Sequence, residues 1–459
     1  MKRANYDVVI IGGGQAGIPL AFALAKVGQR VALAERAQLG GSCVNFGCTP
    51  TKAAIASAKV AHQARRAADY GLGIPTVEVN FPAVIKRAKG IVMGSRGMLE
   101  RAFEGSDNPK LLHGHARLAG RDDQGFCVRV GDAVVTTRQV VLNTGTRSFI
   151  PSVDGLDEVD FIHAGNWLER SELPEHLAIM GGGYIGLEMG QFYRRMGSRI
   201  TVIEEGAHVA SHEDEDVAST IQALLEGEGL EFRLNTRVKR VHAKGNCVTL
   251  ILNGADGLSE LKASHLFVAT GRQPNTDDLG LETVGVKVTQ RGIVETNKLL
   301  ATSAEGIWVA GDIRGGPMFT HTSWDDYRVL ESQLIGDKSR TTDRLVPYAM
   351  FTDPELGRVG LTEREARCAF KEVQVARFEM KNNGKAREIG EPDGFIKVVV
   401  DARTNRILGA AVLATEAAEL VHMYIDLMNA DAPYTAIRDA VHIHPTLAEA
   451  VQSAVALIK

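Results

Sequence analysis

Cysteine is scarce in this chain, and features typical of secreted, membrane-bound or nucleic-acid-binding proteins are missing. Five cysteines in 459 residues are few and odd in number, which excludes a secreted framework held by disulfides. The formal net charge of -4 gives no electrostatic reason to expect a nucleic acid or a membrane surface as partner. One long apolar run, at 8–27, contains a glycine cluster at 12–14 and fits a strand, a turn and a helix better than an export signal or membrane span. We therefore predict a cytoplasmic location, where a disulfide is more often catalytic than structural.

The segment 40–52 places Cys43 and Cys48 five positions apart. A disulfide across so short a loop can open and re-form without unfolding the chain. Pro50 suits the first turn of a helix, so Cys48 would lie at a helix N-terminus, where the helix dipole favours a thiolate. A structural disulfide or two unrelated thiols are the alternatives, but the dense motif favours redox chemistry. We predict a redox-active Cys43–Cys48 disulfide.

Two glycine-rich turns, each between an apolar strand and a helix, predict two dinucleotide-binding units. Glycines in the GxGxxG spacing let the backbone approach a pyrophosphate, and an acid ending the next strand can accept a ribose hydroxyl. The first copy consists of Gly12, Gly14, Gly17 and Glu35, and the second of Gly181, Gly183, Gly186 and Glu204. Because neither copy has decayed, we predict two bound dinucleotides. With the dithiol, they suggest a relay from nicotinamide through flavin to disulfide.

Three further strand ends carry candidate binding residues. Gly145 and Gly271 follow apolar runs and would form turns where the chain crosses between domains. Asp312 ends another short strand and is suited to bind a sugar or ribityl hydroxyl. From about residue 343 the sequence changes to β-rich runs at 396–400 and 408–413 and then to a long helical stretch, which indicates a separate C-terminal domain.

With these motifs in this order over essentially the full length, the chain resembles the FAD-dependent pyridine nucleotide–disulfide oxidoreductases, which include dihydrolipoamide dehydrogenase, glutathione reductase and mercuric reductase. The segment 442–449 is similar to the signature of the family's interface domain. There, the resemblance implies, His444 is an acid–base catalyst oriented by Glu449. It would reach the disulfide of the other subunit, so the resemblance also implies a homodimer with shared active sites.

The resemblance assigns roles to further residues. Cys48 would be the thiol next to the flavin, forming a charge-transfer complex as thiolate, and Cys43 the interchange thiol that meets the disulfide or dithiol substrate. Lys52 and Glu188 look like the family's ion pair beside flavin N5, although two solvated surface charges are the alternative. Tyr184 resembles the aromatic lid that nicotinamide displaces, with simple packing as the alternative. The resemblance also implies that Thr320 and His321 begin a helix whose N-terminus faces the flavin pyrimidine.

The predicted fold is α/β, with two Rossmann-like dinucleotide-binding domains and an α+β C-terminal dimerisation domain. We predict FAD binding by residues 1–150, NAD binding by 151–272, a return to the FAD or central domain at 273–342, and an interface domain at 343–459. The residues predicted to bind FAD are Gly12, Gly14, Gly17, Glu35, Gly145, Asp312, Thr320 and His321. Those predicted to bind NAD(H) are Gly181, Gly183, Tyr184, Gly186, Glu204 and Gly271. No resident metal is predicted.

NADH is predicted over NADPH, because arginines that would hold a 2′-phosphate are missing after Glu204 until Arg233. The substrate stays open. Phe22 stands where glutathione reductases have an arginine, and the chain lacks the C-terminal cysteine pair of mercuric reductases. A dihydrolipoamide dehydrogenase-like activity is the best-defined option. The alternatives are a mercuric reductase-like reductase of metals or oxidants, and a flavin–dithiol redox sensor with little turnover.

Overall fold

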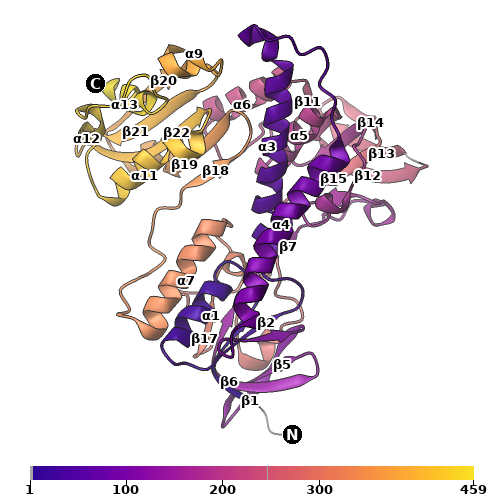
Figure 1. Cartoon of the computed structure of the whole chain (residues 1–459), viewed down its shortest axis with the longest axis vertical. Coiled ribbons are helices and arrows are strands. Elements are labelled where there is room, and N and C mark those ends of the chain that lie inside the picture. Colours follow the sequence, from indigo (N-terminus) through magenta and orange to yellow (C-terminus); the bar gives the residue numbers. More distant parts are fainter. Residues whose placement is uncertain (1–3, 246) are drawn as a thin grey trace.

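The computed structural model describes residues 4–245 and 247–459, which form two α/β units with parallel strands and a C-terminal antiparallel sheet (Figure 1). Two long helices run between these parts along the long axis of the molecule in Figure 1. The α/β fold class and the C-terminal domain predicted from the sequence are confirmed. Within the described residues, no helix combines the length and the apolar character needed to cross a membrane.

The first unit forms around β1 (Ala4–Ile11), whose last four residues are buried. It pairs in parallel with β2 (Val31–Glu35) and β6 (Ala133–Leu142), and the sheet order is β3-β2-β1-β6-β5-β4 with β17 beside β6. The other strands of this sheet are β3 (Lys110–His113), β4 (Ala116–Asp122), β5 (Gly125–Val130) and β17 (Ile307–Val309). Because β17 joins this sheet, the chain returns to the first unit after the second. There α1 (Gly17–Lys26) packs against α7 (Thr320–Ile335).

The long helices α3 (Cys48–Arg65) and α4 (Phe81–Glu104) pack side by side (Figure 1). They follow the short helix α2 (Gly41–Asn45). The Asn80 side chain accepts a hydrogen bond from the backbone N–H of Ala83 and so caps α4. Because α3 also packs against α5 (Tyr184–Met196) of the second unit, its first residue, Cys48, lies at the junction of the two units.

The second unit repeats the same design, with a parallel sheet in the order β11-β10-β9-β15-β8. Its elements are β8 (Ile162–His163), β9 (His176–Met180), α5 (Tyr184–Met196), β10 (Arg199–Ile203), α6 (Glu215–Gly227), β11 (Leu230–Arg233) and β15 (His265–Val268). An antiparallel sheet adjoins it: β12 (Arg237–Lys244), β13 (Cys247–Gly254) and β14 (Gly257–Ala263). The chain crosses between the units through the antiparallel pair β7 (Thr146–Ser148) and β16 (Arg272–Pro274).

The C-terminal domain is an antiparallel sheet in the order β18-β19-β22-β21-β20. Its strands are β18 (Tyr348–Met350), β19 (Glu355–Gly360), β20 (Val373–Glu379), β21 (Phe395–Asp401) and β22 (Arg406–Ala414). Its helices are α8 (Glu363–Ala369), α9 (Gly384–Glu388), α10 (Ala417–Leu420), α11 (His422–Asn429), α12 (Thr435–Arg438) and α13 (Glu449–Ala456). The predicted long helical stretch is wrong: Pro433 and Pro445 fall between these short helices and lack the N–H that a continuous helix needs.

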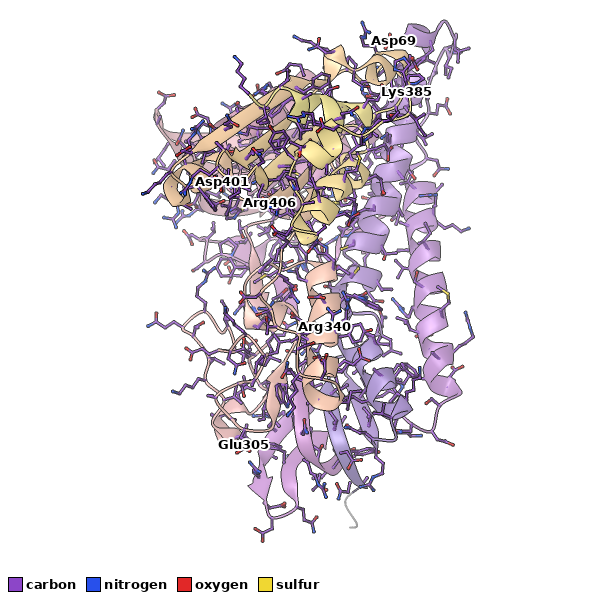
Figure 2. The ribbon with its side chains drawn as sticks, turned by 90° about the vertical axis from the view of Figure 1, so that its left-hand side faces the viewer. Asp69, Glu305, Arg340, Lys385, Asp401 and Arg406 are labelled. Carbon is purple, nitrogen blue, oxygen red and sulfur yellow. The ribbon has the colours of Figure 1, made fainter. Side chains whose placement is uncertain are left out.

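One end of this domain rests on the end of α3. Arg66 donates a hydrogen bond of 2.9 Å to Glu391, and Figure 2 shows Asp69 near Lys385 of α9 at this end of the molecule. The short 3-10 helices of the chain are Ala67–Tyr70, Leu156–Glu158, Trp167–Glu169, Leu281–Val284, Asp312–Arg314 and Met380–Asn382.

Candidate active site

The turn after β1 forms a cradle for a pyrophosphate. Gly12 has a φ of +110°, and a Cβ there would lie 2.2 Å from the Asn143 carbonyl oxygen. A Cβ on Gly17, the first residue of α1, would lie 2.3 Å from the Gly12 carbonyl oxygen. Side chains are thus excluded at these positions, which leaves the N-terminus of α1 open to an anion. Glu35 accepts the Gly13 N–H at 2.8 Å, which fixes the carboxylate beside the turn.

The turn after β9 has the same construction. Gly181 has a φ of +106°, and a Cβ there would lie 2.5 Å from the Ala269 carbonyl oxygen. A Cβ on Gly186 would lie 2.1 Å from the Gly181 carbonyl oxygen. Glu204 accepts the Gly182 N–H at 2.7 Å, as Glu35 does in the first unit. Both predicted fingerprints therefore have the backbone geometry of a dinucleotide site.

A single cavity of about 1260 Å³ joins the two turns. Its wall includes the predicted residues Gly12, Gly14, Glu35, Cys43, Cys48, Lys52, Gly145, Gly181, Gly183, Tyr184, Glu188, Glu204, Gly271, Asp312, Thr320 and His321. Gly17 and Gly186 instead lie just behind the turns, against backbone oxygens. The fold therefore brings the two nucleotide turns and both cysteines to one continuous space.

Both cysteines are free thiols, Cys43 in α2 and Cys48 at the first position of α3. The hydrogen bond between the thiols lowers the pKa of Cys48 to about 6, helped by the Thr320 hydroxyl at 3.3 Å and by the charge of Lys52, against desolvation. The same hydrogen bond, together with burial, raises the pKa of Cys43. At neutral pH the pair therefore holds one thiolate, on Cys48, and one protonated thiol, on Cys43.

Two side chains, one from α2 itself and one from a distant segment, hold the backbone around the cysteines. The Asn45 amide donates to the Leu39 carbonyl at 3.0 Å and to the Gly41 carbonyl at 2.9 Å. Trp167, which is fully buried, donates its indole N–H to the Phe46 carbonyl at 2.8 Å. The Asn45 amide thus links the backbone carbonyls on both sides of the turn that leads into α2, and so fixes the shape of that turn.

Lys52 and Glu188 form an ion pair across the junction of α3 and α5. Their Nζ and Oε2 atoms are 2.7 Å apart, and the side chain of Glu188 is only 8% exposed. The other carboxylate oxygen of Glu188 accepts the Phe351 N–H at 2.9 Å. The Lys52 charge in the cavity wall lowers the pKa of Cys48 and favours its thiolate, whereas the Glu188 carboxylate acts in the opposite direction.

Three predicted residues lie where α7 and β17 reach the cavity. Asp312 accepts a hydrogen bond from the Thr146 hydroxyl at 3.0 Å, and burial raises the pKa of this carboxyl. Thr320 begins α7 and contacts Cys48. His321 binds the Pro347 carbonyl at 2.6 Å through Nε2. The N-terminus of α7 therefore faces the same space as the thiolate of Cys48.

His444 and Glu449 lie together but are absent from the wall of the cavity that contains the cysteines. His444 Nδ1 is 3.0 Å from Glu449 Oε1, and the other carboxylate oxygen accepts the Thr446 N–H at 2.8 Å. The His444 side chain is 77% exposed, and its neighbour Ile443 is 79% exposed. The structure thus forms the predicted dyad on an exposed surface with an apolar side chain beside it.

Two dinucleotide folds that open onto a shared cavity with a dithiol define a flavoprotein-type disulfide reductase. Comparison with known proteins agrees: residues 6–326 match the family model "Pyridine nucleotide-disulphide oxidoreductase", and residues 346–455 match the dimerisation domain of that family. The chain belongs to the pyridine nucleotide-disulphide oxidoreductase family. It is an FAD- and pyridine nucleotide-dependent disulfide oxidoreductase with a domain for homodimer formation, as predicted.

The chain is similar to relatives with several activities. It is 33% identical to the probable pyridine nucleotide-disulfide oxidoreductase RclA of Escherichia coli, over 99% of this chain and 100% of the relative. It is 33% identical to dihydrolipoyl dehydrogenase of Cupriavidus necator, over 98% and 97% of the two chains. It is 32% identical to mercuric reductase of Streptomyces lividans, over 98% and 96%. A solved Cu(II) complex of the HOCl-induced flavoprotein disulfide reductase RclA from Escherichia coli has a TM-score of 0.89 at 33% identity, covering 99% of this chain and all of that one.

Two residues that shape the site, Asn143 and Trp167, were not predicted from the sequence. Asn143 lies at the end of β6, where its amide binds both Gly17 and Ala310, and a polar residue closing an apolar strand was the available signal. Trp167 is distant in sequence from the redox motif, and the chain gives no local sign of their contact.

Proposed function

We propose that this protein has a dihydrolipoamide dehydrogenase-like activity and transfers electrons from NADH to a disulfide substrate of the lipoamide type through Cys43 and Cys48. The observation that carries the proposal is the asymmetric thiol pair, with the pKa of Cys48 lowered to about 6 and that of Cys43 raised, on the wall of a cavity shared by two dinucleotide folds. A purely structural disulfide does not require its two thiols to differ in pKa, whereas thiol–disulfide exchange does benefit from one thiolate and one protonated thiol.

The residues present fit FAD in the first unit. The glycine cradle at Gly12 and the open N-terminus of α1 suit its pyrophosphate, Glu35 its ribose, and Asp312 a ribityl hydroxyl. When bound, FAD supplies the step that converts a hydride from the nicotinamide into two electrons for the disulfide. Lys52 contributes a fixed positive charge in the wall of this cavity.

The thiol pair then performs thiol–disulfide exchange. Cys43, once deprotonated, attacks one sulfur of the substrate disulfide, and the other substrate sulfur leaves as a thiolate that takes up a proton. The Cys48 thiolate next attacks the sulfur of Cys43, which forms the Cys43–Cys48 disulfide and releases the second substrate sulfur as a thiolate that takes up a proton from solvent. Two electrons have then passed from the pair to the substrate, and NADH restores the dithiol.

His444 is the proposed base for Cys43 and the proposed acid for the leaving thiolate. Glu449 orients its ring through Nδ1, so Nε2 is available for proton transfer. Since His444 lies exposed on the dimerisation domain and outside the cavity of its own chain, we assign it to the cavity of the partner subunit. Each active site would then combine residues of both chains.

The second unit is the proposed site of the coenzyme. Glu204 would accept the 2′-hydroxyl of NADH and repel the 2′-phosphate of NADPH. The nearby Arg237 is paired with Glu205 at 3.2 Å, which supports the absence of an arginine dedicated to phosphate. A cytoplasmic location remains part of this proposal.

The test is anaerobic oxidation of NADH by the FAD-loaded protein with oxidised lipoamide. We expect turnover above about 10 s⁻¹, an ordinary enzymatic rate, that vanishes in Cys43→Ser. A Cys368→Ser variant is the matched control, because Cys368 is exposed and lies outside the cavity wall. Reduction of the thiol pair without turnover on any disulfide would instead favour a redox sensor.

A second candidate is reduction of a metal ion as substrate. It is favoured by the likeness to mercuric reductase of Streptomyces lividans and to RclA of Escherichia coli, which has been solved as a Cu(II) complex both unaltered and as a C43S mutant. NADH oxidation with Cu(II) or Hg(II) that requires Cys43, combined with no activity on lipoamide, would select this candidate over the first.

A further inference from the structure

The ring of Tyr184, at the start of α5, lies at the junction of the second unit with the cavity. Its hydroxyl donates a hydrogen bond to the carboxylate of Glu213. Burial and the neighbouring carboxylate raise the pKa of Tyr184, so the phenol keeps its proton and remains a donor. The ring is therefore held by a specific polar bond as well as by packing.

Glu213 is a buried anion with partners in the C-terminal domain. Its side chain has an exposed fraction of 0%, and its Oε2 atom lies 3.1 Å from Arg358 Nε. Tyr348 donates its hydroxyl to Glu213 Oε1 at 2.9 Å. Arg358 is itself tied to β22 by a 3.0 Å hydrogen bond to the Ala410 carbonyl. Because Arg358 compensates the charge and the domain fixes Arg358, the acceptor of the Tyr184 hydroxyl is rigidly placed.

The ring of Tyr184 also has a fixed aromatic neighbour. Its centroid is 5.6 Å from that of Tyr348, which is stacked on Phe319 at 5.4 Å with an interplanar angle of 10°. Both neighbours belong to the cavity wall. The loop that leads to Glu213 lies on the nucleotide turn, since the Ala210 N–H donates to the Gly182 carbonyl at 2.9 Å.

We propose that Glu213 is a positioning residue that latches Tyr184 in the closed position, so that a nicotinamide coenzyme must break the Tyr184–Glu213 hydrogen bond in order to bind. The proposal rests on the proposed function, in which the second unit binds NADH, and on the role of lid over the nicotinamide site that the family resemblance implies for Tyr184. Binding then costs the free energy of the latch, and the C-terminal domain sets that cost through Arg358 and Tyr348.

The experiment measures the Kd of NAD⁺ by titration calorimetry on the FAD-loaded protein. In Tyr184→Phe the ring remains but the latch is lost, so the closed state is less stable. We expect NAD⁺ to bind about tenfold more tightly, the value of one hydrogen bond to a charged group. Tyr193→Phe is the matched control: Tyr193 lies on the same helix, fully buried, and its hydroxyl has no hydrogen-bond partner within the described residues. Its Kd should stay within about twofold of the wild type, since no bond is lost.

A second variant separates the latch from a general loosening of the domains. Glu213→Gln keeps an acceptor but removes its charge, so we expect a smaller tightening in the same direction, about threefold. Unchanged or weaker NAD⁺ binding in Tyr184→Phe would overturn the proposal. Tightening in Glu213→Gln alone would also overturn it, because the lid would then not be involved. Because binding of NAD⁺ does not require turnover on lipoamide, failure of the latch and failure of the proposed function give different results.

Discussion

The two dinucleotide units can be compared position by position, because each forms the same turn after its first strand. The φ angle is +110° at Gly12 and +106° at Gly181. The acid that ends the second strand accepts a backbone N–H of the turn at 2.8 Å in the first unit, on Glu35, and at 2.7 Å in the second, on Glu204. The cradle itself therefore does not distinguish the two sites.

The difference lies in what surrounds the two cradles. In the first unit, Asn143 accepts the Gly17 N–H at 2.9 Å and donates to the Ala310 carbonyl at 2.9 Å. In the second unit Ala269 lies against the turn instead, and its methyl group can make neither bond. The second unit has the hydroxyl of Tyr184 at its opening. One site is thus fixed by buried amide bonds, whereas the other carries Tyr184, the side chain that we propose moves when the coenzyme binds. This difference suits FAD that stays bound and a coenzyme that enters and leaves in each turnover.

The largest effect that separates the two units should come from filling the cradles. Gly17→Ala places a Cβ 2.3 Å from a backbone oxygen in the first unit, and Gly186→Ala places one 2.1 Å from a backbone oxygen in the second. We expect Gly17→Ala to raise the Kd of FAD at least about tenfold, a loss of ~1.4 kcal/mol or more in affinity, and so to lower the FAD content of the purified protein. Gly186→Ala should keep FAD and lose NADH binding.

The measurement is the ratio of flavin absorbance at 450 nm to protein absorbance in the purified variants. Gly90→Ala on α4 is the control, because a Cβ there meets nothing within 4 Å. If Gly186→Ala loses FAD and Gly17→Ala keeps it, the assignment of the two units is reversed.

Asn143→Ala should make the first unit resemble the second. The change leaves the Gly17 N–H and the Ala310 carbonyl without their buried partner, and each such loss costs about 1–3 kcal/mol. We expect the free energy of unfolding to fall by about 3 kcal/mol and FAD to dissociate faster on dilution. Chemical denaturation and flavin fluorescence check both effects, with the exposed Asn253→Ala as control. Equal stability and equal retention of FAD would show that the amide does not fix the first site.

Glu204, the acid that follows the second strand of the second unit, should determine the preference for NADH over NADPH. We predict that kcat/KM with NADH exceeds that with NADPH at least about tenfold, or ~1.4 kcal/mol, and that Glu204→Ala reduces the preference to within about threefold. Glu205→Ala is the matched control, because Glu205 is adjacent but exposed and paired with Arg237. Equal kcat/KM values for the two coenzymes in the wild type would contradict the assignment.

The smallest predicted effect concerns the charge beside the thiolate. With the pKa of Cys48 lowered to about 6, half of this thiol is ionised near pH 6, and the thiolate is lost as the pH falls further. Removing the cation in Lys52→Met should move the titration to higher pH, so that well under half is ionised at pH 6. Thiolate absorbance at 240 nm of the reduced, FAD-free protein, measured against Cys48→Ser, tests this. Lys59→Met on the same helix should not change the titration, and a shift there equal to that of Lys52→Met would contradict a specific role.

The sequence was informative wherever a function depends on residues close together in the chain. The two glycine turns, the acids that follow them and the cysteine pair are local patterns, and the fold class that they predicted is confirmed. The structure adds contacts over long distances in sequence, such as Asn143 with Gly17, 126 positions apart, and Tyr348 with Glu213, 135 positions apart. Such contacts depend on how separate elements pack: a polar residue after an apolar strand marks Asn143 as unusual, but one sequence does not show which residues it contacts. The exposed position of His444 is likewise set by domain packing.

The most direct test of the account is a count of the electrons that the protein accepts. Anaerobic titration with dithionite should consume about two reducing equivalents of two electrons per FAD in the wild type, one for FAD and one for the Cys43–Cys48 disulfide, as sequential reduction of a flavin and a disulfide requires. In Cys43→Ser the count should fall to about one, since the disulfide cannot form. The same count in both proteins would mean that these cysteines hold no electrons, and the proposed path to the substrate would be wrong.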